Sequence, residues 1–251
     1  MTVAQLLKFG SYTFPNVFYV ASVPGDSAVE ADAAPYRDGV IIGASRLGEK
    51  RIEIRGTLMA TTTETLRTRL DALLAAVNTG RQKLYLWNDR FIYATKIGFA
   101  TDFDHASQDS YCDVAISFLC DTALWEAETA STDSWVSPAN GNTRVIAVTG
   151  NAPALPVFKF TFPNAGTSAT NIQLTIAGLS FTLIGTVYQN DAISVDVYNN
   201  TVFQPNTLAN KMAWFDGVFL PLVVGNNTLT YNIVSGTAPI NITTTWRNRW
   251  Y

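Results

Sequence analysis

An alternation of apolar and polar residues between positions 113 and 121 constrains the fold of this chain more than any other feature. Successive side chains of a β-strand point to opposite faces, so this pattern predicts a strand with one buried face. The predicted buried face carries Val114, Ile116, Phe118 and Cys120, and the other carries Asp113, Ala115, Ser117, Leu119 and Asp121. We expect that second face to be wet or to form an interface.

Two further strands precede this one. Lys83–Trp87 and Phe91–Phe99 are rich in β-branched and aromatic residues, and Asn88-Asp89-Arg90 is a polar break of hairpin length between them. The sequence therefore predicts a hairpin followed by a third, two-faced strand.

One helix is predicted over about residues 62–78. Thr61 and Glu64 have the spacing of a capping box, and Asn78-Thr79-Gly80 supplies a C-terminal stop. The apolar stripe of this helix consists of Leu66, Leu70, Leu73, Leu74 and Val77. Because apolar strands lie nearby in the sequence, we expect this stripe to pack against their sheet.

Residues 22–39 have a different composition. Ser22–Gly39 is acidic, rich in small residues and without any period, and it is longer than ordinary connections. Two interpretations remain open: a mobile surface loop, or an arm that orders against a neighbouring subunit. Val40–Gly43 and Glu49–Leu58 are then predicted as two strands, with Arg51 and Arg55 pointing outward from the second.

A composition change after residue 127 indicates a domain boundary. Of the 17 Lys and Arg residues and 20 Asp and Glu residues, only five of each follow residue 127. We predict a mainly β chain with a first domain over 1–127, a β-sandwich or split-barrel-like domain with one helix. A linker over 128–142 and a β-sandwich or jelly roll over 143–251 follow. The strands predicted in the second domain are Val157–Phe162, Ile172–Ile176, Ser180–Ile184, Ala192–Val197, Phe219–Val224, Asn227–Ile233 and Ile240–Trp246.

Charge and cysteine content exclude several classes of protein. The net charge of −3, with basic and acidic residues interleaved, argues against nucleic-acid binding. No segment has the length of apolar sequence that a spanning helix or a secretory signal needs, so we expect synthesis in the cytoplasm and no membrane partner. Cys112 and Cys120 lie too far apart on one predicted strand to form a disulfide.

Catalytic and metal sites find little support. His105 lies beside Asp102, Asp104 and Asp109, but the segment lacks a nucleophile elbow, an EF-hand glycine and the ligand spacing of a zinc site. The carboxylates of the second half are Glu128, Asp133, Asp191, Asp196 and Asp216, and those near turn signals are explained as turn formers. We therefore expect no enzyme and assign no catalytic, cofactor-binding or metal-ligating residue.

Aromatic side chains are the remaining binding candidates. Exposed rings could stack on sugars. The rings near loops or strand ends are Trp135, Tyr188, Tyr198, Trp214 and Tyr231. Filling of the sandwich core is the simpler interpretation of these rings.

The order of several motifs resembles the distal tail proteins of bacteriophages with long, non-contractile tails. The resemblance covers the first half best and extends to the second through Asn227–Ile233 and Thr245–Tyr251. The first-half motifs that carry it are Phe9–Phe14, Arg51–Leu58, Leu66–Leu73, Asn88–Ala94 and Phe118–Glu126.

The resemblance implies a structural role in the virion. The first domain would form a hexameric ring at the tail tip, and a galectin-like second domain similar to a carbohydrate-binding module would project from it. The implied partners are the tail tube protein, a tail-associated hub, fibre or lysin protein, and a receptor-binding protein. We expect ring contacts on the outward faces of Asp113–Asp121 and Arg51–Arg55 and on the Ser22–Gly39 arm. The alternative is a carbohydrate-binding module that recognises a bacterial surface saccharide.

Overall fold

The alternating strand lies in the middle of an antiparallel sheet. In the computed structural model, β8 (Tyr111–Cys120) pairs with β5 (Val40–Met59) on one side and with β7 (Arg90–Asp102) on the other. The apolar face of β8 is buried, whereas Asp113 is exposed, so the predicted two-faced strand is confirmed. The structure describes residues 7–15, 17–23, 25–33, 40–102, 111–162, 168–188, 191–236 and 240–251.

The chain divides into two compact units, Met1–Glu128 and Thr129–Tyr251. The sheet of the first unit has the strand order β2-β1-β6-β7-β8-β5-β3, with β4 beside β5 and β9 beside β7. The remaining strands of this unit are β1 (Lys8–Phe9), β2 (Tyr12–Thr13), β3 (Tyr19–Ser22), β4 (Gly25–Ala33), β6 (Gln82–Trp87) and β9 (Trp125–Ala127). The predicted hairpin is confirmed, because β6 and β7 pair on either side of Asn88 and Asp89.

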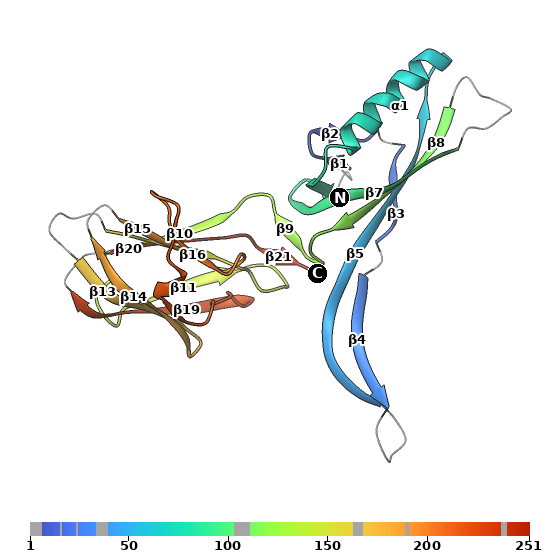
Figure 1. Ribbon diagram of the computed structural model, residues 1–251. Helices are drawn as coiled ribbons and strands as arrows, with labels where there is room; N and C mark the ends of the chain where they lie inside the picture. Colours follow the sequence, from blue (N-terminus) through green and yellow to red (C-terminus); the bar gives the residue numbers. More distant parts are fainter. Residues whose placement is uncertain are drawn as a thin grey trace. The chain divides into compact units, whose positions relative to one another are not determined.

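Helix α1 (Thr63–Val77) covers one face of this sheet (Figure 1). Leu66, Leu73 and Val77 are buried on its inner side, as the apolar stripe predicted. Its N-cap is Thr62, whose side chain accepts a hydrogen bond from the Thr65 backbone N–H, so the predicted Thr61–Glu64 capping box is wrong by one residue. Two adjacent threonines offer the same chemistry, and only the backbone decides which one caps.

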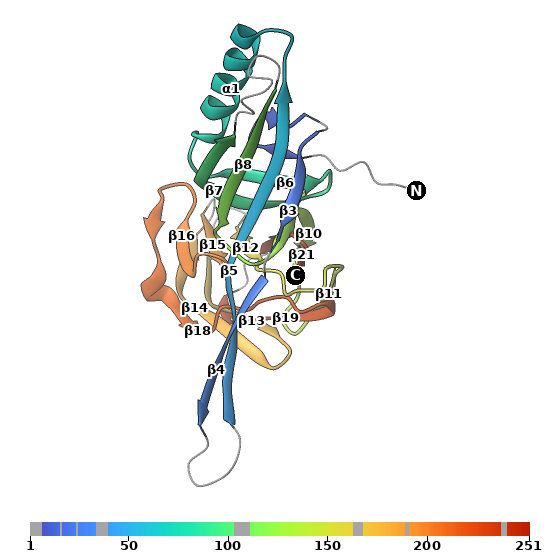
Figure 2. The ribbon, with the colours of Figure 1, turned by 90° about the vertical axis from the view of Figure 1, so that its right-hand side faces the viewer.

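Strands β4 and β5 form a long hairpin that leaves the rest of the sheet (Figures 1 and 2). The sequence predicted two strands over Val40–Leu58, but β5 is continuous from Val40 to Met59. The sequence also missed β4, because Asp, Glu, Gly and Ala are poorly represented in strands. Residues 34–39, the end of the expected arm, lie outside the described part of the chain.

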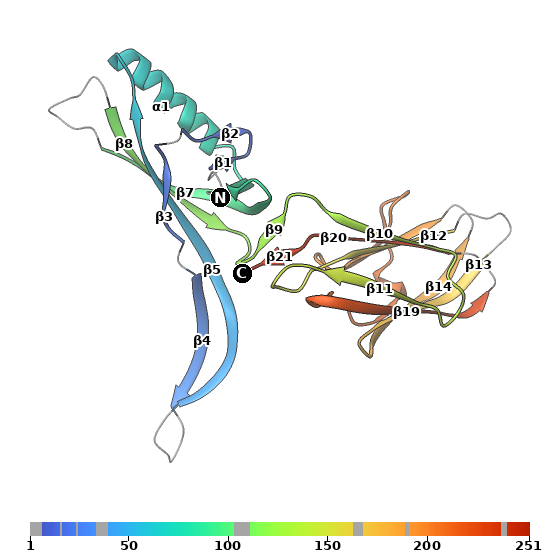
Figure 3. The same ribbon diagram turned by 180° about the vertical axis from the view of Figure 1, so that it is seen from behind.

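The second unit is built from two antiparallel sheets, which Figure 3 shows from behind. The first has the order β10-β20-β12-β15-β16-β17, with β10 (Ser131–Val136), β20 (Asn241–Trp246), β12 (Val157–Thr161), β15 (Ala192–Asp196), β16 (Thr201–Gln204) and β17 (Ala209–Asn210). The second has the order β11-β19-β13-β14-β18, with β11 (Thr143–Val148), β19 (Gly225–Gly236), β13 (Ser168–Ile176), β14 (Leu179–Tyr188) and β18 (Phe215–Gly217). A 3-10 helix, η1 (Met212–Trp214), precedes β18, and β21 (Arg249–Trp250) lies near the C-terminus.

Side chains from both sheets of the second unit meet in one core. Phe158 and Phe160 of β12 pack with Phe181 of β14 at ring-centroid distances of 5.9 and 6.2 Å. Ile193 of β15 and Leu229 of β19 belong to the same buried cluster. The part of the chain that the structure describes is therefore mainly β, with one α-helix and three antiparallel sheets, and the second unit is the predicted sandwich.

Two predictions for the second half are wrong. The expected linker 128–142 contains β10, which pairs along its whole length with β20. Its Ser, Thr and Asp residues hid a strand whose stability comes from its neighbour. Phe219–Val224 is not a strand: only Leu222 makes a bridge, to Ala154, and the Asn227 side chain bonds the Val223 backbone in place of a ladder.

Candidate interaction surface on the first sheet

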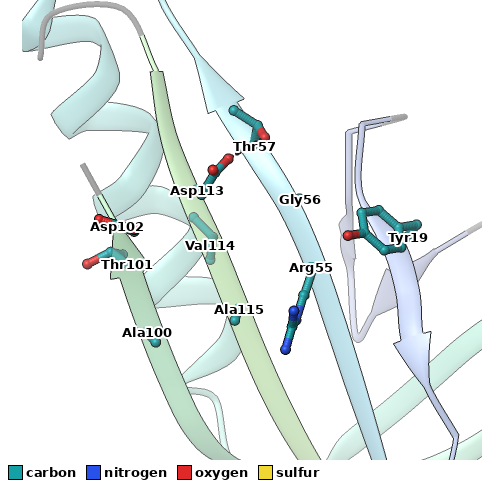
Figure 4. Close-up of a pocket in the computed structure, with 10 residues that line it drawn as sticks. All are labelled: Tyr19, Arg55, Gly56, Thr57, Ala100, Thr101, Asp102, Asp113, Val114 and Ala115. Carbon is teal, nitrogen blue, oxygen red and sulfur yellow. Dashed lines mark hydrogen bonds between the residues drawn. The ribbon is translucent and has the colours of Figure 1, made fainter. Parts of the chain in front are cut away.

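A shallow groove of about 420 Å³ lies on the face of the first sheet opposite α1 (Figure 4). Ala100 of β7 and Ala115 of β8 are paired in register, and their small side chains leave space there. Tyr19 of β3 and Arg55 of β5, also paired, line the groove as well. Four neighbouring strands thus place two alanines beside a tyrosine and an arginine, and the small side chains form the floor of the groove.

Polar groups line one end of the groove. Thr57 Oγ1 donates a hydrogen bond to Asp113 Oδ1 at 2.5 Å, which Figure 4 marks, and Asp102 is paired in register with Asp113. Arg55 Nε lies 2.8 Å from Glu53 Oε1 on the same strand, which raises the pKa of the exposed Arg55 guanidinium. Exposed pairs of this kind contribute little to stability but can fix the register of two surfaces.

A second groove, of about 380 Å³, adjoins the first through Thr57. Apolar residues dominate its lining, which includes Tyr12, Val17 and Met59. Arg69 and Ala72 of α1 also line it, so this groove borders the helix. Val17 is 46% exposed, Tyr19 54% and Met59 57%. Large apolar side chains exposed together beside a groove are typical of a protein–protein contact surface.

The two strand faces predicted to be outward lie on the side of the sheet that carries the first groove. Arg51, Arg55 and Asp113 are exposed, and Ala115, Ser117 and Leu119 are half-buried. Sequence reasoning missed Tyr19, Gly56 and Ala100, which come from segments far apart in the chain. An alternating pattern identifies the face of a strand but not its neighbours in the sheet.

The metal and catalytic candidates do not form a site in the described part of the chain. His105, Asp104 and Asp109 lie outside the described residues, while Asp102 ends β7. Among the described residues, no three His, Cys, Asp or Glu side chains are grouped so that they could hold a metal ion. Within the same residues, no helix has the length and apolar character needed to cross a bilayer.

Four of the five candidate carboxylates of the second half accept hydrogen bonds, and the fifth, Asp216, is exposed in β18. Asp133 accepts three hydrogen bonds from Arg144, one from Nη2 to Oδ1 at 2.6 Å and two from Nε, to Oδ2 at 3.0 Å and to Oδ1 at 3.3 Å. Asp196 accepts from the Asn199 backbone N–H, and Asp191 accepts from Gln204 Nε2. In the first unit, Glu128 accepts from Lys83 Nζ and Tyr85 Oη. These contacts join strands or close turns, so they account for the four carboxylates as structural groups.

Three of the aromatic candidates are occupied by packing. Tyr231 is buried, and Trp135 packs edge-on against it with ring centroids 6.3 Å apart. Trp214 covers Gly185, where an added Cβ would lie 2.7 Å from its ring, and Lys211 Nζ lies 4.1 Å from its ring centroid. Tyr198 is 40% exposed, and the side chain of Tyr188 lies outside the described part. Core filling therefore accounts for Tyr231, Trp135 and Trp214.

A buried amine and a buried thiol lie at the base of the β4–β5 hairpin. Lys50 and Cys120 are paired in register between β5 and β8, and they are 7% and 4% exposed. Burial raises the pKa of the Cys120 thiol to about 12, although the nearby Lys50 ammonium opposes the shift. Burial likewise lowers the pKa of Lys50. Both groups are thus held toward their neutral forms. Cys112 and Cys120 are both free thiols, as predicted.

Comparison with known proteins places this fold among phage tail components. Residues 2–120 match the family model described as "Phage tail protein RIFT-related domain", and residues 149–250 match "Siphovirus-type tail component, C-terminal domain". No curated protein matches the sequence significantly.

One solved phage protein shares the fold over nearly the whole chain. The crystal structure of phage SPP1 Dit (gp 19.1), described as a paradigm of the hub adsorption apparatus, covers 98% of this chain and 99% of its own, with a TM-score of 0.75 and 16% identity. A match to the phage P2 baseplate in its activated conformation with Ca covers 90% of this chain and 90% of the baseplate chain, with a TM-score of 0.46 and 12% identity.

The two family models together span most of the sequence. One lies within the first unit and the other within the second. Both describe structural components of phage tails. This chain belongs to the distal tail protein family of siphovirus-type phage tail components.

Proposed function

We propose that six copies of this chain form a closed ring at the tip of the phage tail, which joins the tail tube to the baseplate. The observation that carries the proposal is the β4–β5 hairpin. Among the described residues, Val40 to Glu49 pair with β4 alone, because β8 begins to pair with β5 only at Lys50. This stretch extends roughly 30 Å at the usual rise of a strand.

A two-stranded ribbon of that length is marginally stable in water unless it packs against something else. The hairpin is therefore the best candidate for an arm that orders on a neighbouring subunit. Its β4 strand carries Asp26, Glu30 and Asp32, which would disfavour pairing of two such arms with each other.

A ring also needs two different surfaces on each subunit, because its contacts are head-to-tail. The arm supplies one of them. The two adjoining grooves, with exposed Tyr19, Val17 and Met59, supply a candidate for the other. The mixed charges of Glu53, Arg55 and Asp113 could set the register of such a contact.

Under this proposal the first unit forms the ring and the second projects from it as a peripheral domain. The ring would contact the tail tube protein on one side and a hub, fibre or lysin protein on the other. The second unit would carry the docking site of a receptor-binding protein. Recognition of a host saccharide by the second unit stays a prediction from the sequence.

A substitution in the groove tests the proposal. In Ala115→Arg, a long cation replaces a half-buried methyl group that lines the groove, on the face away from the core, so the chain should fold but lose its ring. Thr228→Arg is the matched control, because Thr228 is an exposed strand residue of the second unit. Sedimentation velocity should show monomers for Ala115→Arg and rings for Thr228→Arg. Rings of unchanged size in both variants would contradict the groove's role.

A second variant tests the arm. Replacing residues 27–47 by a two-residue turn removes the unsupported ribbon and leaves the β5 segment that pairs with β8. We expect a folded chain that stays monomeric. If this variant still closes into rings, the arm is not a ring contact.

A further inference from the structure

Asn140-Gly141 is the one Asn-Gly step in the sequence, and it lies at the centre of a tight turn. The Asn142 backbone N–H donates to the Ala139 carbonyl at 3.0 Å, which places Asn140 and Gly141 at the two central positions. Gly141 has φ +80°, and Asn140 is not among the residues with positive φ. A turn in which only the second central residue has positive φ is of type II.

An Asn-Gly step is chemically unstable. The backbone nitrogen of Gly141 can attack Cγ of Asn140, forming a new C–N bond as the side-chain amide leaves as ammonia. Water then opens the resulting five-membered imide at either carbonyl, which yields aspartate or isoaspartate. Glycine permits this because it has no Cβ to crowd the attacking nitrogen, and no oxidant or cofactor is needed.

The folded turn opposes ring closure in three ways. The Gly141 N–H donates to the Tyr231 carbonyl at 2.8 Å, which holds the nucleophile on β19. The Ile233 backbone N–H donates to Asn140 Oδ1 at 2.9 Å, which holds the electrophilic amide. In a type II turn the first central residue has ψ near +120°, whereas the imide needs its Cβ and the next nitrogen almost eclipsed about the Cα–C bond.

We propose that Asn140 is a site of spontaneous deamidation that the attachment of the 137–142 loop to β19 suppresses. The reaction proceeds only when this loop detaches, so its rate reports local opening of the second unit. Conversion to isoaspartate would also keep the loop from reattaching. It lengthens the backbone, adds a negative charge and removes the amide that now accepts from Ile233, so the loop could not reattach in the same way.

The test compares deamidation of the full chain in native buffer and in denaturant at the same mildly alkaline pH, by peptide mapping with mass spectrometry. Loss of two backbone contacts should accelerate the reaction at Asn140 roughly tenfold or more in denaturant. Equal rates in the two conditions would overturn the proposal.

Two variants locate the effect. Asn142→Ala removes the side-chain oxygen that accepts from the Ala139 N–H at 2.8 Å, so it should raise the rate in native buffer and leave the rate in denaturant unchanged. Asn210→Ala, which removes a similar acceptor for the Met212 N–H at the end of β17, should change neither rate. A native rate at Asn140 that responds equally to both variants would mean global and not local opening, and would overturn the assignment to this loop.

Discussion

At the scale of single residues, the first sheet leaves little room at Gly56 of β5. A Cβ at this position would lie 2.4 Å from Cγ of the Phe18 ring, and Phe18 is itself buried. Glycine is required here by the close approach of the ring and not by its own backbone angle. The sequence could not reveal this, because Phe18 precedes β3 and Gly56 lies in β5.

Gly56→Ala should therefore destabilise the chain by about 1–3 kcal/mol, because the ring or the strand must move to admit a methyl group. Chemical denaturation monitored by tryptophan fluorescence measures this loss. In a Phe18→Ala background the same substitution should cost much less. An equal cost in both backgrounds would mean that the ring is not the obstacle.

Cys120 gives the stability a pH dependence. Its pKa is about 12 in the folded chain and near 8.5 in an unfolded one, so the folded state retains the proton longer. Below pH 8.5 the thiol is protonated in both states and no stability is lost. As the pH rises toward 12 the unfolded state ionises first, so the free energy of unfolding falls, by about 2 kcal/mol at pH 10. Unfolding free energies at pH 7.5 and 10 should thus differ less in Cys120→Val than in the natural chain. An unchanged difference would contradict this account.

At the scale of elements, helix α1 and the strands near it follow from sequence pattern, whereas the arm does not. The apolar stripe of α1 and the alternation of β8 each fix which side is buried, and both predictions are confirmed. Strands β4 and β10 consist largely of Asp, Ser, Thr, Ala and Glu, so their structure depends on pairing with β5 and β20. Propensity alone cannot detect strands of that kind.

Leu73 provides the prediction at this scale. Its side chain is fully buried under α1, whereas Leu70 on the same helix is half-buried. Leu73→Ala should cost about 2–5 kcal/mol through lost apolar contacts and the cavity left behind. Leu70→Ala, the matched control, should cost clearly less in the same denaturation experiment. Equal losses would mean that the burial of Leu73 does not set its contribution to the packing of α1.

At the scale of the whole molecule, the chain combines two β units with no grouped metal ligands among its described residues. Sequence patterns indicated both units and the sandwich class of the second. They identified which faces of two strands point outward, but the first groove depends on β3, β5, β7 and β8 lying side by side. That arrangement is a property of the folded sheet, so no single segment encodes it.

The central claim is that this chain closes into a ring through its first unit. Multi-angle light scattering of the purified full-length protein, coupled to size-exclusion chromatography, measures the mass of the particle directly. The account predicts a particle of six times the chain mass that falls to a monomer in Ala115→Arg. A full-length protein that remains monomeric across the concentration range, with or without the tail tube protein, would contradict it.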